Sequence, residues 1–366
     1  MTQHESDQRG LQERLEVQDR PARRGRRGGR EREQLMVPPA SFTSYYGRPV
    51  LKPSPWEADI PAYLFAGGLA AGSALLAAGG DLTGRPALRR TGRLGAAAGL
   101  AVSMVALVHD LGRPSRFANM LRTAKLTSPM SVGTWIISGF APFAGVAAAA
   151  EVAGLLPAVQ GSRVAPVVRV AGRVGGVGAG FMAPALAAYT AVLLADTATP
   201  TWHDGFRELP FVFVGSAAAA SGGLGLIGAP VAQNGPARRF AVGGAVLDLV
   251  AAQRMEASMG LSAEPLQEGL AGRLMRASQL LTISGATGAL LGGRWRPIAA
   301  LSGAALIAGS VCTRFGIFEA GQASAKDPKY TVVPQRARLE AGEPVRFEPS
   351  PPRSQLRALV HHLTGR

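Results

Sequence analysis

Apolar, uncharged stretches alternate with short charged segments through most of the chain. Eight such stretches occur, at residues 60–80, 94–108, 126–150, 174–195, 209–233, 240–253, 277–293 and 297–313. A helix that crosses a bilayer needs about 20 apolar residues, so the second, sixth, seventh and eighth stretches are expected to continue through the charged residues that flank them. The pattern therefore predicts an all-α integral membrane protein with about eight transmembrane helices.

Small residues recur inside these stretches and indicate close packing. Gly68 and Gly72 form a G-x-x-x-G motif, and glycine also occupies positions 175, 176, 178 and 180. Small residues let helix backbones approach each other closely in lipid. We therefore expect a compact transmembrane bundle over residues 56–320, built from two four-helix halves.

Two polar segments flank the predicted bundle. Residues 1–55 are rich in Arg and Glu and poor in aliphatic residues, which predicts a disordered basic N-terminal tail. They contain no apolar run of the kind found in a secretory signal, so the first helix itself is expected to direct membrane insertion. Residues 321–366 are polar and proline-rich, which predicts an extended C-terminal tail.

Basic residues exceed acidic ones, with 39 Lys and Arg against 24 Asp and Glu and a formal net charge of +15. Such a surplus is typical of proteins that bind nucleic acid or a membrane surface. The basic segment 20–32 lacks interleaved aromatic residues and adjoins no base-reading fold, so we expect the lipid bilayer, and not nucleic acid, as the partner. An even number of spans places both tails on one side, the tail face. The basic tails favour the cytoplasm for this face, although the short loops alone favour the opposite orientation.

Ionisable and phenolic side chains gather where the predicted spans meet the tail face. Such groups are costly at membrane depth and usually mark function. They are Asp59, Tyr63, His109, Asp110, Arg113, Asp196, Arg314 and Glu319. The opposite loops carry mainly arginines of the ordinary flanking type, with Asp81 and Glu151 as their acids. The tail face is therefore the predicted reaction or docking site.

The spacing of these residues suits proton-coupled chemistry. Asp59 and Tyr63 are four residues apart and share a helix face. His109 and Asp110 place a titratable imidazole beside a carboxylate, which suits a quinone because quinone chemistry moves two protons with two electrons. In the alternative interpretation, Asp110 and Arg113 form an interfacial salt bridge and His109 only lines the bundle.

Histidine and cysteine are too scarce for most metal centres. The histidines are His4, His109, His203, His361 and His362. A haem b within the spans needs pairs of axial histidines, whereas His109 alone is expected near membrane depth. The single cysteine, Cys312, cannot hold an iron–sulfur cluster, and ligands for a zinc or di-iron site are lacking. We therefore expect no haem, no iron–sulfur cluster and no other metal in this chain.

Two features of the later spans have alternative interpretations. Residues 223–228 match G-x-G-x-x-G, but they lie in an apolar span and follow no strand, so dinucleotide binding is not expected. Asp248 lies in the middle of the sixth span, where it either belongs to a proton path or hydrogen-bonds a Ser or Thr of a neighbouring helix. A secondary transporter with a site near the membrane midplane is an alternative function that Asp248 supports.

Two segments carry a family resemblance. Residues 56–72, WEADIPAYLFAGGLAAG, combine a tryptophan at the helix entry with a glycine-rich middle. Residues 109–122, HDLGRPSRFANMLR, are followed by SPMS at 128–131 and by Trp135. These segments closely resemble the first helix and the second loop of the NrfD/PsrC family of membrane subunits, and a weaker similarity continues to residue 335.

The resemblance implies an eight-helix subunit without a cofactor of its own. It implies electron exchange between a membrane quinone, menaquinone or ubiquinone, and a four-cluster iron–sulfur subunit that is bound to a molybdopterin catalytic subunit. Polysulfide, nitrite, tetrathionate and some formate enzymes use similar modules. In the polysulfide type a first-helix histidine touches quinone, and Tyr63 occupies the matching position. Tyr189 resembles a quinone-contacting tyrosine of the fourth helix and shares a helix face with Asp196.

We interpret the chain as a multi-pass plasma-membrane subunit of anaerobic respiration, part of a quinone-linked oxidoreductase complex and not an enzyme by itself. Quinone is expected between the first, second and fourth spans, with His109 and Asp110 handling protons. The expected quinone-binding residues are Tyr63, Asp59, Arg113, Tyr189 and Asp196. A purely structural membrane anchor is the remaining alternative, and it would require neither His109 nor Asp110.

Overall fold

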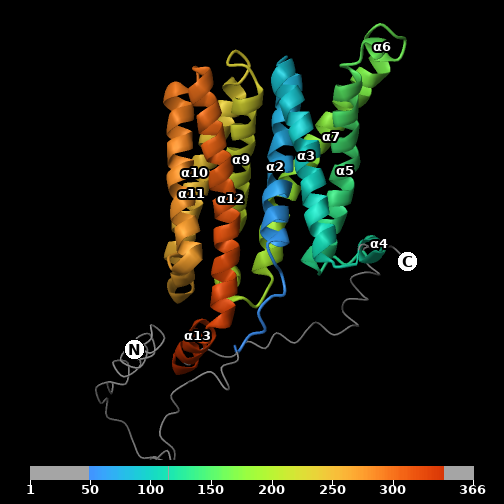
Figure 1. The fold of residues 1–366 in the computed structure, drawn as a ribbon. Coiled ribbons are helices and arrows are strands. Elements are labelled where there is room, and N and C mark those ends of the chain that lie inside the picture. Colours follow the sequence, from blue (N-terminus) through green and yellow to red (C-terminus); the bar gives the residue numbers. More distant parts are fainter. Residues whose placement is uncertain (1–48, 114, 342–366) are drawn as a thin grey trace, which may run out of the picture. The chain divides into compact units, whose positions relative to one another are not determined.

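The computed structural model describes residues 49–113 and 115–341 (Figure 1). The regular secondary structure of this part is helical, without strands. Its helices are α2 (Asp59–Leu82), α3 (Pro86–Asp110), α4 (Ser115–Leu121), α5 (Pro129–Ala153), α6 (Pro157–Gln160), α7 (Ala165–Ala195), α8 (Pro200–Asp204), α9 (Leu209–Gly228), α10 (Gly235–Ser258), the 3-10 helix η2 (Gly260–Leu266), α11 (Gly269–Gly292), α12 (Arg296–Lys326) and α13 (Lys329–Glu340). Nearly all of the predicted N-terminal tail, residues 1–48, lies outside the described residues.

The eight predicted stretches correspond in order to eight long helices. α2, α3, α5, α7, α9, α10, α11 and α12 are 20 to 31 residues long. Six of these helices, all except α10 and α11, are long and apolar enough to cross a membrane. α10 and α11 fall short because charged and polar residues are spread along them. The chain is a multi-pass membrane protein, and a total of eight crossings stays a prediction.

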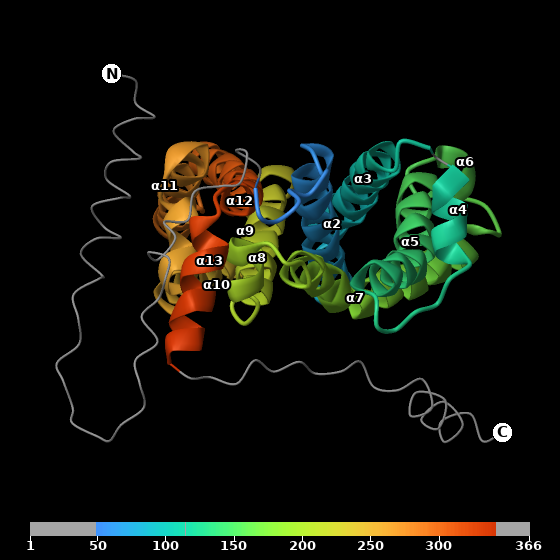
Figure 2. The same ribbon diagram turned by 90° about the horizontal axis from the view of Figure 1, so that it is seen from below.

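The long helices form two groups of four (Figure 2). α2, α3, α5 and α7 pack together as the first half, and α9, α10, α11 and α12 pack together as the second half. The halves meet where α2 and α7 pack on α9 and where α2 reaches α12. α2 and α9 are therefore the helices that contact both halves most extensively.

The G-x-x-x-G motif of α2 lies at this junction. A Cβ atom at Gly68 would lie 3.1 Å from the Cβ of Ala217 in α9, and one at Gly72 would lie 3.0 Å from the Ala217 carbonyl oxygen. Within the first half, a Cβ atom at Gly99 of α3 would lie 2.8 Å from the carbonyl oxygen of Ala66 in α2. The predicted close approach of helix backbones is confirmed, because side chains at these positions would overlap a neighbouring helix.

A proline, and not the first residue of the apolar stretch, marks the start of most long helices. It occupies the first or second position of α3, α5, α7, α9, α10 and α12, where its missing N–H has no helical partner to lose. α7 consequently begins at Ala165, ahead of the predicted residue 174. At its other end, α12 extends beyond the predicted residue 313 to Lys326.

The prediction of an extended tail from residue 321 is wrong as far as residue 340. α12 continues to Lys326, and α13 covers Lys329–Glu340. Asp327 Oδ1 accepts the backbone N–H of Lys329 at 2.9 Å, and Pro328 pre-sets the backbone angle for a helix start. A proline interpreted as part of an extended tail therefore begins a helix. Residues 342–366 lie outside the described residues.

Candidate functional site

Most predicted site residues lie at one end of the bundle. α2 begins there, and α3, α7 and α12 end there; this tail face is the lower end in Figure 1. Gln322 of α12 donates hydrogen bonds from Nε2 to the carbonyl oxygens of Ser54 at 3.2 Å and Trp56 at 3.1 Å. The entry to α2 is thus held beside the end of α12.

His109 contacts the carboxylate of Asp59, and not that of the adjacent Asp110. Its Nδ1 lies 2.6 Å from Oδ2 of Asp59, which begins α2. The His109 side chain is 78% exposed and that of Asp59 is 33% exposed. The second ring nitrogen, Nε2, has no hydrogen-bond partner within the described part of the chain. The structure therefore places an imidazole–carboxylate pair at the tail face, with one ring nitrogen open to exchange protons.

The other polar residues of the tail face do not join this pair directly. Asp110 is half-buried, while Arg113 is exposed in the turn before α4. No ion pair connects these two described side chains, so the salt bridge of the alternative interpretation is not formed. Asp196 caps the C-terminus of α7 and is exposed.

Two buried tyrosines lie on α2 and α7. Tyr63 is 3% exposed and Tyr189 is 7% exposed, and both belong to the main apolar core. The ring of Tyr189 occupies the space that a side chain at Gly133 of α5 would need. Among the described residues, the Tyr189 hydroxyl is buried without a hydrogen-bond partner. A buried phenol without a partner is costly, and it is suited to donate to a carbonyl oxygen supplied by a ligand.

Asp248 lies apart from these residues, in α10 of the second half. It is 4% exposed, and the charge of Arg314 of α12 acts on it electrostatically. The sequence places Arg314 at the end of the eighth span, which is wrong: α12 continues for 12 further residues, and Arg314 is 1% exposed. Its Nη2 donates to the Phe213 carbonyl oxygen at 2.7 Å, and its guanidinium lies 3.9 Å from the centre of the Phe213 ring.

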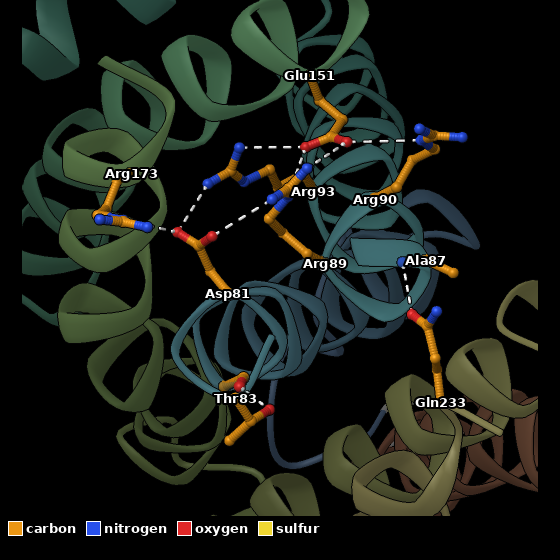
Figure 3. Close-up of polar contacts among 10 residues, drawn as sticks. Asp81, Thr83, Ala87, Arg89, Arg90, Arg93, Glu151, Arg173 and Gln233 are labelled. Atoms are coloured by element: carbon orange, nitrogen blue, oxygen red, sulfur yellow. Dashed lines mark hydrogen bonds and ion pairs between the residues drawn. The ribbon is translucent and has the colours of Figure 1, made fainter. Parts of the chain in front are cut away.

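A network of ion pairs ties the first half together at the opposite end (Figure 3). Arg93 of α3 lies 3.1 Å from Glu151 of α5 and 3.3 Å from Asp81 of α2. Arg89 pairs with the same two acids at 3.0 and 3.4 Å, and Arg173 of α7 lies 3.6 Å from Asp81. Arg93 and Glu151 are only 6% and 5% exposed. The network therefore links α2, α3, α5 and α7.

Interpreting these arginines as ordinary flanking residues misses the network. The available signal is that Arg89 and Arg93 are four residues apart, hence on one helix face, while Asp81 and Glu151 are the acids of the opposite loops. Because the network satisfies its own charges inside the first half, it fits the role of holding four helices in register better than that of a reaction site.

Aromatic residues pack against one another near the tail face. Trp202 of α8 is 1% exposed and donates from Nε1 to the Ile317 carbonyl oxygen at 2.8 Å. Its ring centre lies 5.9 Å from that of Trp56 and 5.6 Å from that of Phe318. Aromatic pairs of this kind, one stacked and one tilted, stabilise the packing beyond the area they bury.

An apolar groove lies away from every predicted site residue. It has a volume of about 640 Å³ and runs between α5 and α7, where apolar residues such as Phe143, Val167 and Val174 line it. It fits acyl chains better than a proton-exchanging headgroup. Within residues 49–113 and 115–341, no group of three or more His, Cys, Asp or Glu side chains is placed to hold a metal ion.

Comparison with known proteins gives one finding. No curated protein matches the chain. Residues 50–236, just over half of the 366, match the family described as polysulphide reductase, NrfD. The match includes α2, α3, α5, α7 and α9, and with them the His109–Asp59 pair and both tyrosines. The chain belongs to the NrfD polysulphide reductase family.

Proposed function

We propose that this chain is the quinone-reactive membrane subunit of a respiratory molybdopterin oxidoreductase. In this role it passes electrons between the quinone pool and a four-cluster iron–sulfur subunit, which connects to the molybdopterin catalytic subunit. Membership of the NrfD family supports the assignment to such complexes. The contact between His109 and Asp59 at the tail face is the observation that carries the quinone role.

The pair has the properties of a proton-exchange group. A carboxylate on one ring nitrogen fixes the tautomer and stabilises the charged imidazole, which leaves the other nitrogen to take or give the proton. Asp110 adds a second carboxyl one residue along α3. Oxidation of a quinol releases two protons with its two electrons, so a titratable pair at the membrane boundary can pass these protons to water.

The buried tyrosines fit the binding of a quinone headgroup that lies deeper in the membrane than this pair. Tyr63 lies four residues into α2, and Tyr189 lies six residues before the end of α7. At a rise of 1.5 Å per residue, both are roughly 6 to 9 Å inside the tail face. The unpartnered hydroxyl of Tyr189 can then donate to a quinone carbonyl, and we assign Tyr63 to the same headgroup. We assign Asp59, Arg113 and Asp196 to the entrance from the tail face.

The packing of α10 and α11 supports a total of eight crossings. Each has 24 residues, about 36 Å of helix, and packs beside a helix that is apolar enough to cross. Eight crossings put both chain termini on one side of the plasma membrane, and their arginines favour the cytoplasm. The iron–sulfur subunit would then dock on the tail face, close to the proposed quinone site.

The test compares Asp59→Asn, His109→Ala and Asp110→Asn in the purified membrane complex at matched subunit content. We expect quinone-dependent turnover to fall about 10²-fold or more in the first two variants, while reduction of an artificial dye by the catalytic subunit is unchanged. Arg254→Gln, which changes an exposed charge at the tail end of α10, serves as the control. Full quinone turnover in both Asp59→Asn and His109→Ala would contradict the site and favour a purely structural anchor.

A further inference from the structure

The interior of the second half contains polar side chains that the quinone site does not use. All are less than 5% exposed, and they come from every helix of this half. They are Ser216 of α9, Asp248 of α10, Ser278 and Thr282 of α11, and Ser310, Thr313 and Arg314 of α12. Lipid surrounds a bundle of this kind, so an interior of apolar residues would cost less.

The hydroxyls of this cluster are connected in pairs. Ser216 Oγ donates to Ser310 Oγ at 2.8 Å, and the hydroxyls of Ser278 and Thr313 lie 2.6 Å apart. Ser310, Thr313 and Arg314 occupy one turn and one face of α12. Each hydroxyl can both donate and accept a hydrogen bond, so one pair can relay a proton between α9 and α12 and the other between α11 and α12.

Arg314 is held without a complete set of partners. Its Nη2 is bound to the Phe213 carbonyl oxygen, but Nε and Nη1 are buried and have no hydrogen-bond partner in the described part of the chain. Asp248 acts on it electrostatically but forms no direct ion pair with it. Uncharged groups face these residues from three neighbouring helices: Gly68 of α2 lies beside Arg314, Gly215 of α9 lies beside the Asp248 backbone, and Ser278 of α11 contacts Thr313. Asp248 and Arg314 are thus opposite charges buried against the same turn of α9, where Gly215 approaches the Asp248 backbone and the Phe213 carbonyl oxygen accepts from Arg314.

We propose that Asp248, with Arg314 as its counter-charge, is a proton-binding site inside the second half. The pair is neutral while the carboxyl is ionised. Binding of a proton forms the O–H bond of the carboxylic acid and leaves one net positive charge, on Arg314. Such a state is costly in the membrane interior, so the carboxyl group exchanges its proton with its surroundings and is protonated or ionised according to the pH.

The site lies within reach of the tail face. Ser216 is seven residues from the start of α9, Asp248 is ten from the end of α10, and Arg314 is twelve from the end of α12. These separations correspond to roughly 10 to 18 Å of helix. This link rests on the proposed quinone function: protons released at the tail face can then be exchanged with a buried carrier in the neighbouring half.

The first experiment requires neither quinone nor partner subunits. Infrared difference spectra of the full-length protein in lipid nanodiscs are recorded across a pH titration. We expect a carbonyl band of a protonated carboxyl group that titrates in the wild type and is lost in Asp248→Asn. The band should persist in Glu268→Gln, which removes an exposed carboxyl group. Identical titrating bands in wild type and Asp248→Asn would overturn the proposal.

A second variant keeps the test decisive if Asp248→Asn does not fold. Asp248→Glu keeps a carboxyl group on the same helix face, so the titrating band should remain at a shifted frequency. Absence of any band difference between Asp248→Glu and Asp248→Asn would count against the site even if both proteins fold. Because quinone turnover is assayed separately in the complex, failure of the infrared test leaves the quinone assignment intact, and failure of the quinone assay leaves the buried carboxyl to be judged by its own band.

Discussion

Glu151 is the side chain on which three guanidinium groups of α3 converge. Its oxygens lie 3.0 Å from Arg89, 3.1 Å from Arg93 and 3.5 Å from Arg90. Arg93 is buried with it, whereas Arg89 and Arg90 keep part of their surface exposed. Loss of the carboxylate would therefore leave one guanidinium in a poorly solvated position without its main counter-charge.

We expect Glu151→Gln to lower the free energy of unfolding by about 3 kcal/mol, because breaking a buried ion pair by removing one partner leaves the other uncompensated. The measurement is denaturant unfolding in detergent, followed by circular dichroism. Glu57→Gln, at an exposed position of the tail face, is the control and should change stability little. Equal stability of the two variants would show that the network contributes nothing to holding the first half together.

At the residue scale, the sequence predicts the kinds of side chain at the site better than their partners. His109 and Asp110 are adjacent in the chain, but neighbours on a helix point about 100° apart. The partner of His109 is Asp59, 50 residues away. Arg93 and Glu151 are 58 residues apart. Such contacts depend on how α2, α3 and α5 are rotated against each other, and a single sequence does not specify that rotation.

At the scale of elements, α13 is attached to η2 by a few polar contacts. Lys329 Nζ lies 2.9 Å from Oε2 of Glu264, and the Tyr330 hydroxyl donates to the same oxygen at 3.3 Å. Burial raises the pKa of Tyr330 to about 12. The neutral phenol is the form that donates this hydrogen bond, so the contact depends on pH.

The contribution of Tyr330 to docking should be complete below about pH 10, where the phenol is neutral in both folded and unfolded chains, and should be lost as the pH rises through about 12. The measurement is ultraviolet absorbance of tyrosinate, with the titration of Tyr330→Phe subtracted from that of the wild type. The difference curve should have its midpoint near 12. A midpoint at the ordinary tyrosine pKa would mean that α13 does not bury this side chain.

Element positions follow closely from the sequence, while element ends do not. Every apolar stretch corresponds to a long helix, because an uninterrupted run of apolar residues in lipid must satisfy its backbone within a helix. The ends depend on local chemistry instead: Pro166 begins α7 well before its apolar run, and Asp327 with Pro328 separates α12 from α13. A prediction from apolarity alone therefore gives the wrong position for Arg314 and for the start of the C-terminal tail.

At the scale of the whole molecule, Gly72 is where the two halves come closest along α2. A side chain there would overlap Ser221 and the Ala217 carbonyl oxygen of α9. We expect Gly72→Val to lower the free energy of unfolding by roughly 1–3 kcal/mol, because overpacking forces the helices apart. Thermal unfolding in lipid nanodiscs measures the effect. Gly79→Val, two turns later on α2 and with open space around it, is the matched control, and equal effects of both changes would argue against a packed junction.

The arrangement of the halves could be predicted only in outline. Glycine-rich helices predict close packing, and the structure confirms it at Gly68, Gly72 and Gly99. The sequence does not indicate which helices meet, because most long helices carry small residues on more than one face. The burial of Arg314 of α12, in the same half as Asp248 of α10, escaped prediction for the same reason.

The course of α2 has a mechanical consequence. Asp59 begins this helix at the tail face, and nine residues later Gly68 passes so close to α12 that a Cβ atom would lie 3.4 Å from Nη2 of Arg314. Nine residues of helix span about 14 Å, and a hydrogen-bonded helix resists compression along its axis. Movement of the first turn of α2 along the helix axis would therefore shift Gly68 beside the guanidinium of Arg314. A docked subunit or a bound headgroup could cause such a movement, and no charge would have to cross that distance.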